Sequence, residues 1–243
     1  MKLIHEIRAV KSKAELENII KAQRISEKVL ADVLGKLKTG VSEIELSNYI
    51  KKQYLGCGVD VLAFPPIVAF GKNSANIHHE PGTSKLNEGD TVMFDFGGTV
   101  NHYCSDMTRT YFWRPKNGRP TAKQKKVYEA VLRAHELAVA KLQKGEKRAS
   151  VIDKTARDFL GKIFKNNFKH GLGHGVGTVI HEWPNFKPKS EDILPAGCVM
   201  TIEPGIYLPK FGGVRIEDMY LITKNGAESL TNVPKRLEDV ILK

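Results

Sequence analysis

Cysteine is scarce in this sequence, and no two cysteines form a closely spaced motif. The three cysteines are widely separated and include no Cys-x-x-Cys pair: Cys57, Cys104 and Cys198. This pattern argues against both a disulfide framework and a structural zinc site built from thiolates. Long apolar runs are also missing, and charged side chains are scattered through residues 1–20. We therefore expect a cytoplasmic protein with neither a signal peptide nor a membrane partner.

Basic residues outnumber acidic ones, and this excess raises the question of whether the protein binds nucleic acid. The net charge is +11 at pH 7 and the sequence pI is about 9.5. The excess is mostly lysine, which is spread over the whole chain without interleaved aromatic residues. A generally solvated, lysine-rich surface explains this distribution better than a dedicated basic patch. We therefore expect no specific nucleic-acid partner.

The remaining composition and the hydrophobic periodicity indicate one globular α+β unit. The 243 residues are 41% hydrophobic and 27% charged, and no linker divides them, so we expect a single domain over residues 1–243. Apolar spacing and end signals, such as the Ser42–Glu45 capping pattern, predict helices at 12–38, 42–53, 121–142 and 150–166. Strands are predicted at 59–70, in a hairpin over 91–112, and at 178–180, 199–202 and 213–222. The order helix, helix, strands thus occurs twice, which indicates two similarly ordered halves.

The predicted hairpin contains two aspartates in places that suit a carboxylate poorly. Asp95 interrupts an apolar run, and Asp106 follows eleven residues later. Across a tight antiparallel hairpin, this odd separation would place the two residues opposite each other on one face. The carboxylates would repel, so one would be protonated unless a metal ion held both. The alternatives are a metal-binding pair and a surface hairpin, and Cys104 either lines the same face or packs as a small core residue.

Four further residues in the second half lie in unusual settings for surface side chains. His174 lies among glycines in GLGHGVG, which allow the backbone to approach a bound group closely. His181 follows in HEWP, Glu203 directly follows an apolar strand pattern, and Glu217 lies in GGVRIED. Each has an ordinary alternative when taken alone, such as turn capping, helix capping or pairing with a lysine.

Two aspartates, two glutamates and one histidine together form a donor set that suits hard divalent cations. The set consists of Asp95, Asp106, His174, Glu203 and Glu217. Such a set suits two ions such as Mn²⁺, Co²⁺, Fe²⁺ or Zn²⁺ better than it suits a thiolate zinc site. Two ions roughly 3.5–4 Å apart share a water, lower its pKa and clamp a polarised carbonyl. The pattern therefore favours metal-assisted hydrolysis.

Five segments resemble motifs of the pita-bread metallopeptidases, in the same order along the chain. They are FPPIVAFGKNSANIHH, FDFGGTVNHYCSDMTRTYF, HGLGHGVGTVIHEWP, TIEPGIYLP and GGVRIED. Within the family the likeness is to the proline-directed branch, prolidase and aminopeptidase P, with methionine aminopeptidase a more distant relative. The resemblance covers nearly the whole chain. It implies a curved, mainly antiparallel sheet with helices on its outer face and two halves related by a pseudo-twofold axis.

The resemblance also implies how the metal ions would be held. Asp95 would chelate one ion, His174 and Glu203 would hold the other, and Asp106 and Glu217 would bridge both. The implied cofactors are two divalent ions, most readily Mn²⁺ or Co²⁺, with Zn²⁺ or Fe²⁺ as alternatives.

The other matching residues are implied to act on a short peptide. Glu203 is similar to the proton-shuttling glutamate, His78 to a substrate-binding and catalytic histidine, and His181 to the histidine that contacts the developing oxyanion. His170 and Arg215 match substrate-side positions that distinguish the proline-directed enzymes from methionine aminopeptidases. The implied activity is hydrolysis of the N-terminal peptide bond of a short peptide whose second residue is proline.

Alternative functions remain open at this point. Methionine aminopeptidase is one, and a pita-bread binding protein without catalysis is another, although no ligand position is substituted. Prolidases and aminopeptidases P carry an additional N-terminal domain, which we expect to be absent here. A homodimer is a further expectation.

Overall fold

The computed structural model describes residues 2–59 and 61–243, which contain five α-helices: α1 (Lys2–Ala9), α2 (Lys13–Leu34), α3 (Glu43–Gly56), α4 (Ala122–Gln143) and α5 (Ala149–Phe164). Three of them begin with a capping box, in which two side chains satisfy the first free N–H groups: Ser12 with Glu15, Ser42 with Glu45, and Thr121 with Gln124. The four predicted helices are therefore confirmed, with ends shifted by a few residues. Helix α1 is not predicted by the sequence pattern because its 8 residues are too few for a clear period.

The strands form two sheets and two short ribbons. A four-stranded sheet has the order β1 (Ile67–Phe70), β2 (Thr91–Asp95), β5 (Thr108–Trp113) and β13 (Ile241–Leu242), of which only β13 runs parallel to its neighbour. A five-stranded antiparallel sheet has the order β12 (Ala227–Ser229), β11 (Asp218–Ile222), β8 (Val199–Ile202), β6 (Gly173–Gly175) and β7 (Glu182–Phe186). The ribbons are β3 (Thr99–Val100) with β4 (Tyr103–Cys104), and β9 (Gly205–Leu208) with β10 (Gly212–Arg215). Short 3₁₀ turns are η1 (Gly71–Ala75), η2 (Lys116–Gly118), η3 (Lys165–Asn167) and η4 (Leu237–Val240).

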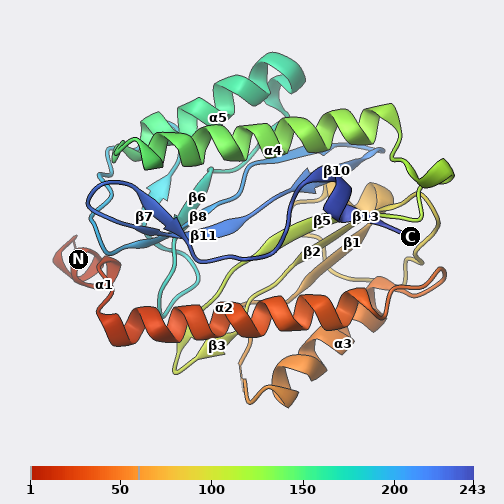
Figure 1. Cartoon of the computed structure of the whole chain (residues 1–243), viewed down its shortest axis with the longest axis horizontal. Coiled ribbons are helices and arrows are strands. Elements are labelled where there is room, and N and C mark those ends of the chain that lie inside the picture. The colour runs from red at the N-terminus through yellow and green to blue at the C-terminus, as the bar shows by residue number, and fades with distance from the viewer. Residues whose placement is uncertain (1, 60) are drawn as a thin grey trace.

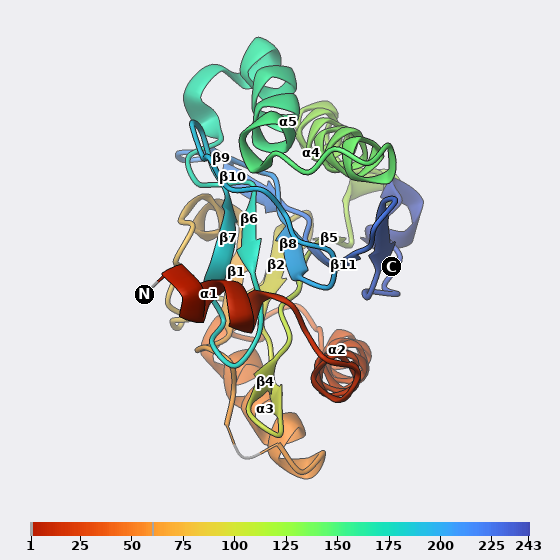
Figure 2. The same ribbon diagram turned by 90° about the vertical axis from the view of Figure 1, so that its left-hand side faces the viewer.

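The strands lie between two pairs of helices. Helices α2 and α3 lie on one side of the strands and α4 and α5 on the other (Figures 1 and 2). Helix α3 packs on β1, whereas α4 contacts β8, β9 and β10. One hydrophobic cluster contains residues of both halves, including Val33, Phe94, Val131 and Ile202. The halves therefore share a continuous core, and none of the described helices is both long and apolar enough to cross a membrane.

The hairpin over 91–112 has a different register from the predicted one. Its turn consists of Asn101 and His102, whose φ angles are 46° and 71°, as a two-residue type I′ turn requires. This turn pairs Asp95 with Thr108, so the prediction that Asp95 and Asp106 lie directly opposite each other is wrong. Asp106 lies two residues closer to the turn and, by strand alternation, on the same face.

Other strand predictions also need correction. Residues 178–180 are bends, and the strands on either side, β6 and β7, were not predicted because β6 lies in a glycine-rich segment. The predicted strand 59–70 is reduced to β1, since Pro65 and Pro66 interrupt the ladder, and residue 60 lies outside the described residues. The predicted strand 213–222 is divided into β10 and β11 by Ile216 and Glu217. This interruption brings Glu217 to the site described next.

Candidate metal centre and active site

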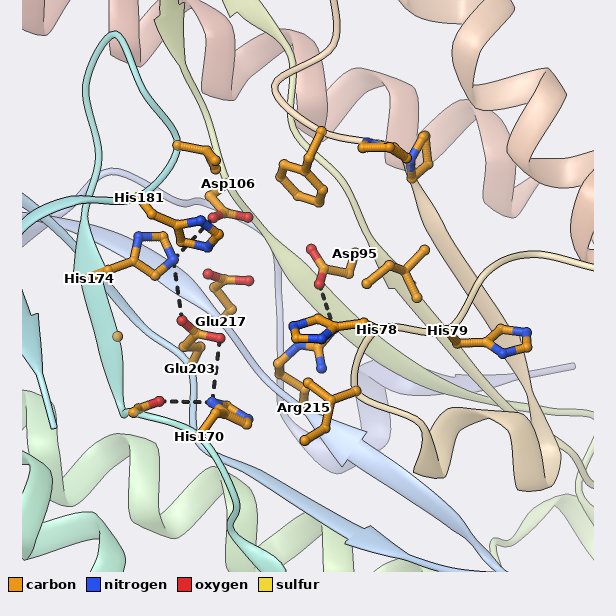
Figure 3. A pocket seen from close by; sticks show the side chains of 18 of the residues that line it. His78, His79, Asp95, Asp106, His170, His174, His181, Glu203, Arg215 and Glu217 are labelled. Atoms are coloured by element: carbon orange, nitrogen blue, oxygen red, sulfur yellow. Dashed lines mark hydrogen bonds and ion pairs between the residues drawn. The ribbon is translucent and has the colours of Figure 1, made fainter. Parts of the chain in front are cut away.

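A cavity of about 740 Å³ is lined by residues of both halves. Part of its wall is apolar and consists of Phe64, Pro65, Pro66, Ile67, Ile77, Ile180 and Phe186. Its polar lining includes carboxylates, imidazoles and the guanidinium of Arg215, among them His78, Asp95, Asp106, His170, His174, His181, Glu203, Arg215 and Glu217 (Figure 3). The structure therefore brings all the site residues named from the sequence into one cavity, although they come from segments up to about 140 positions apart.

Asp106, His174 and Glu217 form a close group within this cavity. One potential ligand atom from each residue lies within 4.8 Å of the other two, and all three residues are buried. Asp106 precedes β5, His174 lies in β6, and Glu217 lies in the break between β10 and β11. Two carboxylates and one neutral imidazole at this spacing can hold a divalent cation.

Glu203 and Asp95 extend this group. The Nε2 atom of His174 lies 3.4 Å from Oε1 of Glu203 and 3.6 Å from Oδ2 of Asp106. Glu203 directly follows β8, and Asp95 is the last residue of β2. Both carboxylates therefore lie at the carboxyl end of a strand. All five predicted ligands therefore face the same space (Figure 3).

Collecting these carboxylates is unfavourable unless a cation compensates them. Burial, together with Glu217 and Asp95, raises the pKa of Asp106 well above its usual range. Burial, together with Glu203 and Asp95, raises the pKa of Glu217 in the same way. Burial also raises the pKa of Glu203 to about 8, although Arg215 opposes this shift. Divalent cations would offset the repulsion and let the carboxylates remain ionised.

His174 is held in a form that can bind a metal ion. Burial and the neighbouring ring of His181 lower its pKa to about 4, so the imidazole is neutral at neutral pH. Its Nδ1 lies 3.0 Å from the carbonyl oxygen of Gly175 and must carry the proton in order to donate to it. The lone pair is then on Nε2, which faces Asp106 and Glu203. This tautomer leaves Nε2 free to coordinate a metal ion on the side of the two carboxylates.

Asp95 is only partly satisfied by protein groups. Its Oδ2 accepts a hydrogen bond from Nη2 of Arg215, whereas its buried Oδ1 has no hydrogen-bond partner in the described part of the chain. An unpaired buried carboxylate oxygen is costly, and a bound cation would satisfy it. The free oxygen of Asp95 and the tautomer of His174 are both observations that fit a metal centre.

Arg215 lies behind the carboxylates and orients them. Its side chain is buried and donates to the Tyr207 hydroxyl at 2.8 Å and to Oγ1 of Thr108 at 3.0 Å, in addition to Asp95. Thr108 in turn donates to Oε2 of Glu217 at 2.7 Å. Thr108 and Tyr207 were not singled out from the sequence. The predicted substrate-binding role of Arg215 stays a prediction, and its contacts add a positioning role.

The other three histidines predicted for the site, His78, His170 and His181, line the same cavity. The ring of His181 packs edge-on against that of His174, with 4.3 Å between centroids. His170 lies 2.8 Å from the Tyr207 hydroxyl through Nε2, and burial, helped by Arg215, lowers its pKa to about 3. His78 is exposed on the segment that follows η1. Among residues 2–59 and 61–243, none of the three belongs to the close group of Asp106, His174 and Glu217.

A buried ion pair behind the site was also missed from the sequence. Nη2 of Arg109 donates to Oδ1 of Asp218 at 2.5 Å, and both side chains are fully buried. Nη1 of Arg109 donates to the carbonyl oxygens of Thr108 at 2.9 Å and Glu217 at 2.6 Å. The pair therefore fastens the backbone of Glu217 to β5. The one signal in the sequence was that the charged Asp218 directly follows the predicted ligand Glu217, and it did not identify Arg109 as the partner.

Removing Arg109 from this pair should destabilise the fold. We expect Arg109→Met to lower the free energy of unfolding by about 3–5 kcal/mol, because it leaves the buried Asp218 carboxylate without its main partner. Denaturant titration measures the change. Arg133→Met is the matched control, since Arg133 and Glu136 form an exposed pair that contributes less than about 1 kcal/mol. Equal losses in the two variants would contradict the structural role of Arg109.

Cys104, which the sequence left open between site and core, is a core residue. It is buried and packs with Ile19 and Val176. It does not line the 740 Å³ cavity, and burial raises the pKa of its thiol to about 11. Its thiol is therefore protonated at neutral pH and is a poor metal ligand.

The fold and the site together define an α+β protein with a candidate metal centre in a cavity shared by its two halves. The sequence profile of metallopeptidase family M24 matches residues 17–224. The chain belongs to this family. It is 40% identical over 236 residues to a Xaa-Pro dipeptidase of Pyrococcus furiosus. The alignment covers 97% of this chain and 66% of that relative.

Solved structures agree with the sequence match. A prolidase from Pyrococcus furiosus superimposes with a TM-score of 0.90 at 40% identity, covering 96% of this chain and 68% of that one. An X-Pro aminopeptidase from Thermotoga maritima gives a TM-score of 0.91 at 33% identity, covering 97% and 66%. The pita-bread fold expected from the motifs is therefore confirmed, and the chain spans about two thirds of the length of these relatives.

Proposed function

We propose that the protein is a dinuclear-metal aminopeptidase that hydrolyses the N-terminal peptide bond of short peptides, with proline as the second residue. One observation carries the proposal: five side chains of metal-binding type face one cavity whose wall is partly apolar. The similarity to proteins named Xaa-Pro dipeptidase and X-Pro aminopeptidase supports it. Because the chain spans only about two thirds of those proteins, the activity needs its own test.

The proposed metal ligands are five residues that face the cavity, which we call the acidic cluster. Asp95, Asp106, His174, Glu203 and Glu217 would hold two divalent ions, with Asp106 and Glu217 shared between them. Mn²⁺ or Co²⁺ is the proposed metal, and Zn²⁺ or Fe²⁺ also suits a donor set of oxygens with one imidazole. When bound, the ions would lower the pKa of a water molecule and polarise the peptide carbonyl.

The chain's own residues would move the proton and orient the peptide. Glu203 lines the cavity beside His174 and can accept a proton at a carboxylate oxygen and deliver it to the leaving amine. His181 lines the same cavity and would offer a ring N–H group to the carbonyl oxygen as negative charge develops on it, and His78, which also lines the cavity, would act as the substrate-binding and catalytic histidine. His170, fixed through Tyr207, lies beside Glu203 and would bound the substrate on that side.

The apolar wall suits a proline ring. A prolyl nitrogen has no N–H and its φ is fixed, so its recognition needs a shaped apolar surface rather than a backbone acceptor. Phe64, Pro66 and Ile77 are among the side chains that supply such a surface. A peptide with proline second would therefore bury its ring without leaving a donor unpaired.

Comparing two tripeptides tests this specificity. With Mn²⁺ present, we expect kcat/KM for Ala-Pro-Ala to exceed that for Met-Ala-Ala, because the apolar wall favours the proline ring. A ratio well below one would assign the chain to the methionine aminopeptidases. Cleavage of neither peptide by the metal-loaded protein would favour a binding protein without catalysis.

We also propose the remaining properties expected from the sequence. Residues 1–243 would form one catalytic domain, and the continuous core of the two halves supports this. A short peptide would be the substrate, and a homodimer, a cytoplasmic location and the lack of a specific nucleic-acid partner stay predictions. Diffuse lysines would bind RNA or DNA only at low salt.

A further inference from the structure

Glu43 is a fully buried carboxylate outside the metal-type group, at the first position of α3. Both of its oxygens are within hydrogen-bonding distance of groups in the segment 70–82, which carries His78. These groups are the N–H of Phe70 (2.8 Å) and Nδ2 of Asn73 (2.9 Å) at Oε1, and Nε2 of His79 (2.8 Å) and the N–H of Gly82 (3.2 Å) at Oε2.

Through these four contacts, the single carboxylate of Glu43 binds several positions of the segment 70–82 and so fixes it as a loop. Phe70 ends β1 and Gly82 lies twelve residues later, so one carboxylate fixes both ends of the loop. Of the four contact residues, His79 lines the cavity, and it directly follows His78. In Figure 3 the two rings point in different directions, with His78 over the cavity near Arg215 and His79 away from the acidic cluster. Fixing His79 therefore fixes the backbone from which His78 projects.

The chemistry of the contacts makes them specific for a carboxylate. An ionised carboxylate only accepts hydrogen bonds, so Nε2 of His79 must carry a proton to join the other three donors. A glutamine at this position would turn its NH₂ group toward one pair of donors and leave a buried N–H unpaired. The charge of Glu43 is thus required for all four contacts together.

Capping of α3 does not explain Glu43. Ser42 and Glu45 already form a complete capping box at this helix end. Glu45 is exposed and also pairs with Lys85, whereas Glu43 is directed into the loop. The two glutamates therefore lie two positions apart with separate tasks.

The second half of the chain contains a similar arrangement. The buried Asp153 of α5 accepts from the N–H of Leu172 at 3.1 Å and pairs with Arg157. Nη2 of Arg157 donates to the carbonyl oxygen of His170 at 2.7 Å. In each half, then, a buried carboxylate on the second of the two main helices holds the segment that carries a cavity histidine.

We propose that Glu43 is a positioning residue that, through His79 and the loop 70–82, holds His78 over the acidic cluster for peptide hydrolysis. The proposal rests on the proposed function, because His78 acts only if a peptide is cleaved there. None of the four hydrogen-bond contacts of the Glu43 carboxylate involves Asp95, Asp106, His174, Glu203 or Glu217. Its removal should therefore affect turnover without releasing metal.

Glu43→Gln and Glu45→Ala form a matched pair of variants for the test. Each is loaded with Mn²⁺, and three quantities are measured: bound Mn²⁺ per chain, amide hydrogen exchange of residues 70–82, and kcat and KM for Ala-Pro-Ala. We expect Glu43→Gln to keep its Mn²⁺, to exchange faster over 70–82, and to lose up to about 10²-fold in kcat with KM little changed. Glu45→Ala should lower the melting temperature while leaving kcat and exchange of the loop near wild-type values.

A second variant protects the test against failure of Glu43→Gln to fold. His79→Ala removes one contact at a partly exposed side chain, and we expect the same direction of change in kcat and exchange. Unchanged exchange over 70–82, or equal kcat in Glu43→Gln and Glu45→Ala, would overturn the proposal. A wild-type protein that cleaves no peptide would instead refute the proposed function, while faster loop exchange would still show that Glu43 holds the loop.

Discussion

Glu217→Gln should deprive the protein of both metal ions and reduce peptide hydrolysis to background. Glu217 belongs to the close group with Asp106 and His174, and as a shared ligand it would contribute to both ions. An amide cannot replace the charge that offsets the cations, and its NH₂ group would face either the metals or the Thr108 hydroxyl that now donates to Oε2. Metal analysis after dialysis against Mn²⁺, together with turnover of Ala-Pro-Ala, measures both losses.

Glu27→Gln is the control for this variant. Glu27 is a largely buried carboxylate that pairs with Arg24 and does not line the cavity. We expect it to retain both ions and full turnover. If Glu217→Gln keeps two tightly bound ions, Glu217 is not a shared ligand and the ligand set must be redrawn.

His181→Ala should have the opposite combination of effects, with metal retained and turnover lost. His181 packs against the ring of His174 but is outside the close group of Asp106, His174 and Glu217. Burial lowers its pKa, which favours the neutral ring, and a neutral ring would donate through its one N–H. Loss of a donor to a developing oxyanion costs about 10²–10³ in kcat. Steady-state kinetics with Mn²⁺ analysis of the same samples measures the effect.

His5→Ala provides the corresponding control, since His5 is an exposed residue of α1. Its kcat and metal content should match the wild type. If metal content falls in step with activity in His181→Ala, His181 is itself a ligand. The proposed set of five ligands must then be revised.

Local signals account for what could be predicted from the sequence. Capping patterns such as Ser42 with Glu45 are contained within four residues, so helix positions follow without tertiary information. Asp95 and Glu203 stood out because one interrupts an apolar run and the other ends an apolar strand, where an unpaired carboxylate is costly. The family motifs then grouped these residues before their distances were known.

Long-range geometry accounts for what could not be predicted. The hairpin register depends on which residues adopt positive φ, and periodicity alone did not place the turn at Asn101 and His102. The pairing of Arg109 with Asp218 spans 109 positions, and that of Glu43 with His79 spans 36. No local pattern reports such contacts, so Thr108, Arg109 and Glu43 were missed, whereas the residues that line the cavity were named.

Reconstitution with metal tests the central claim most directly. The protein is stripped with a chelator, titrated with Mn²⁺, and assayed with Ala-Pro-Ala at each step while bound Mn²⁺ is counted. A dinuclear centre formed by Asp95, Asp106, His174, Glu203 and Glu217 predicts no hydrolysis in the stripped protein and full recovery at two ions per chain. Full hydrolysis by the metal-stripped protein would contradict it.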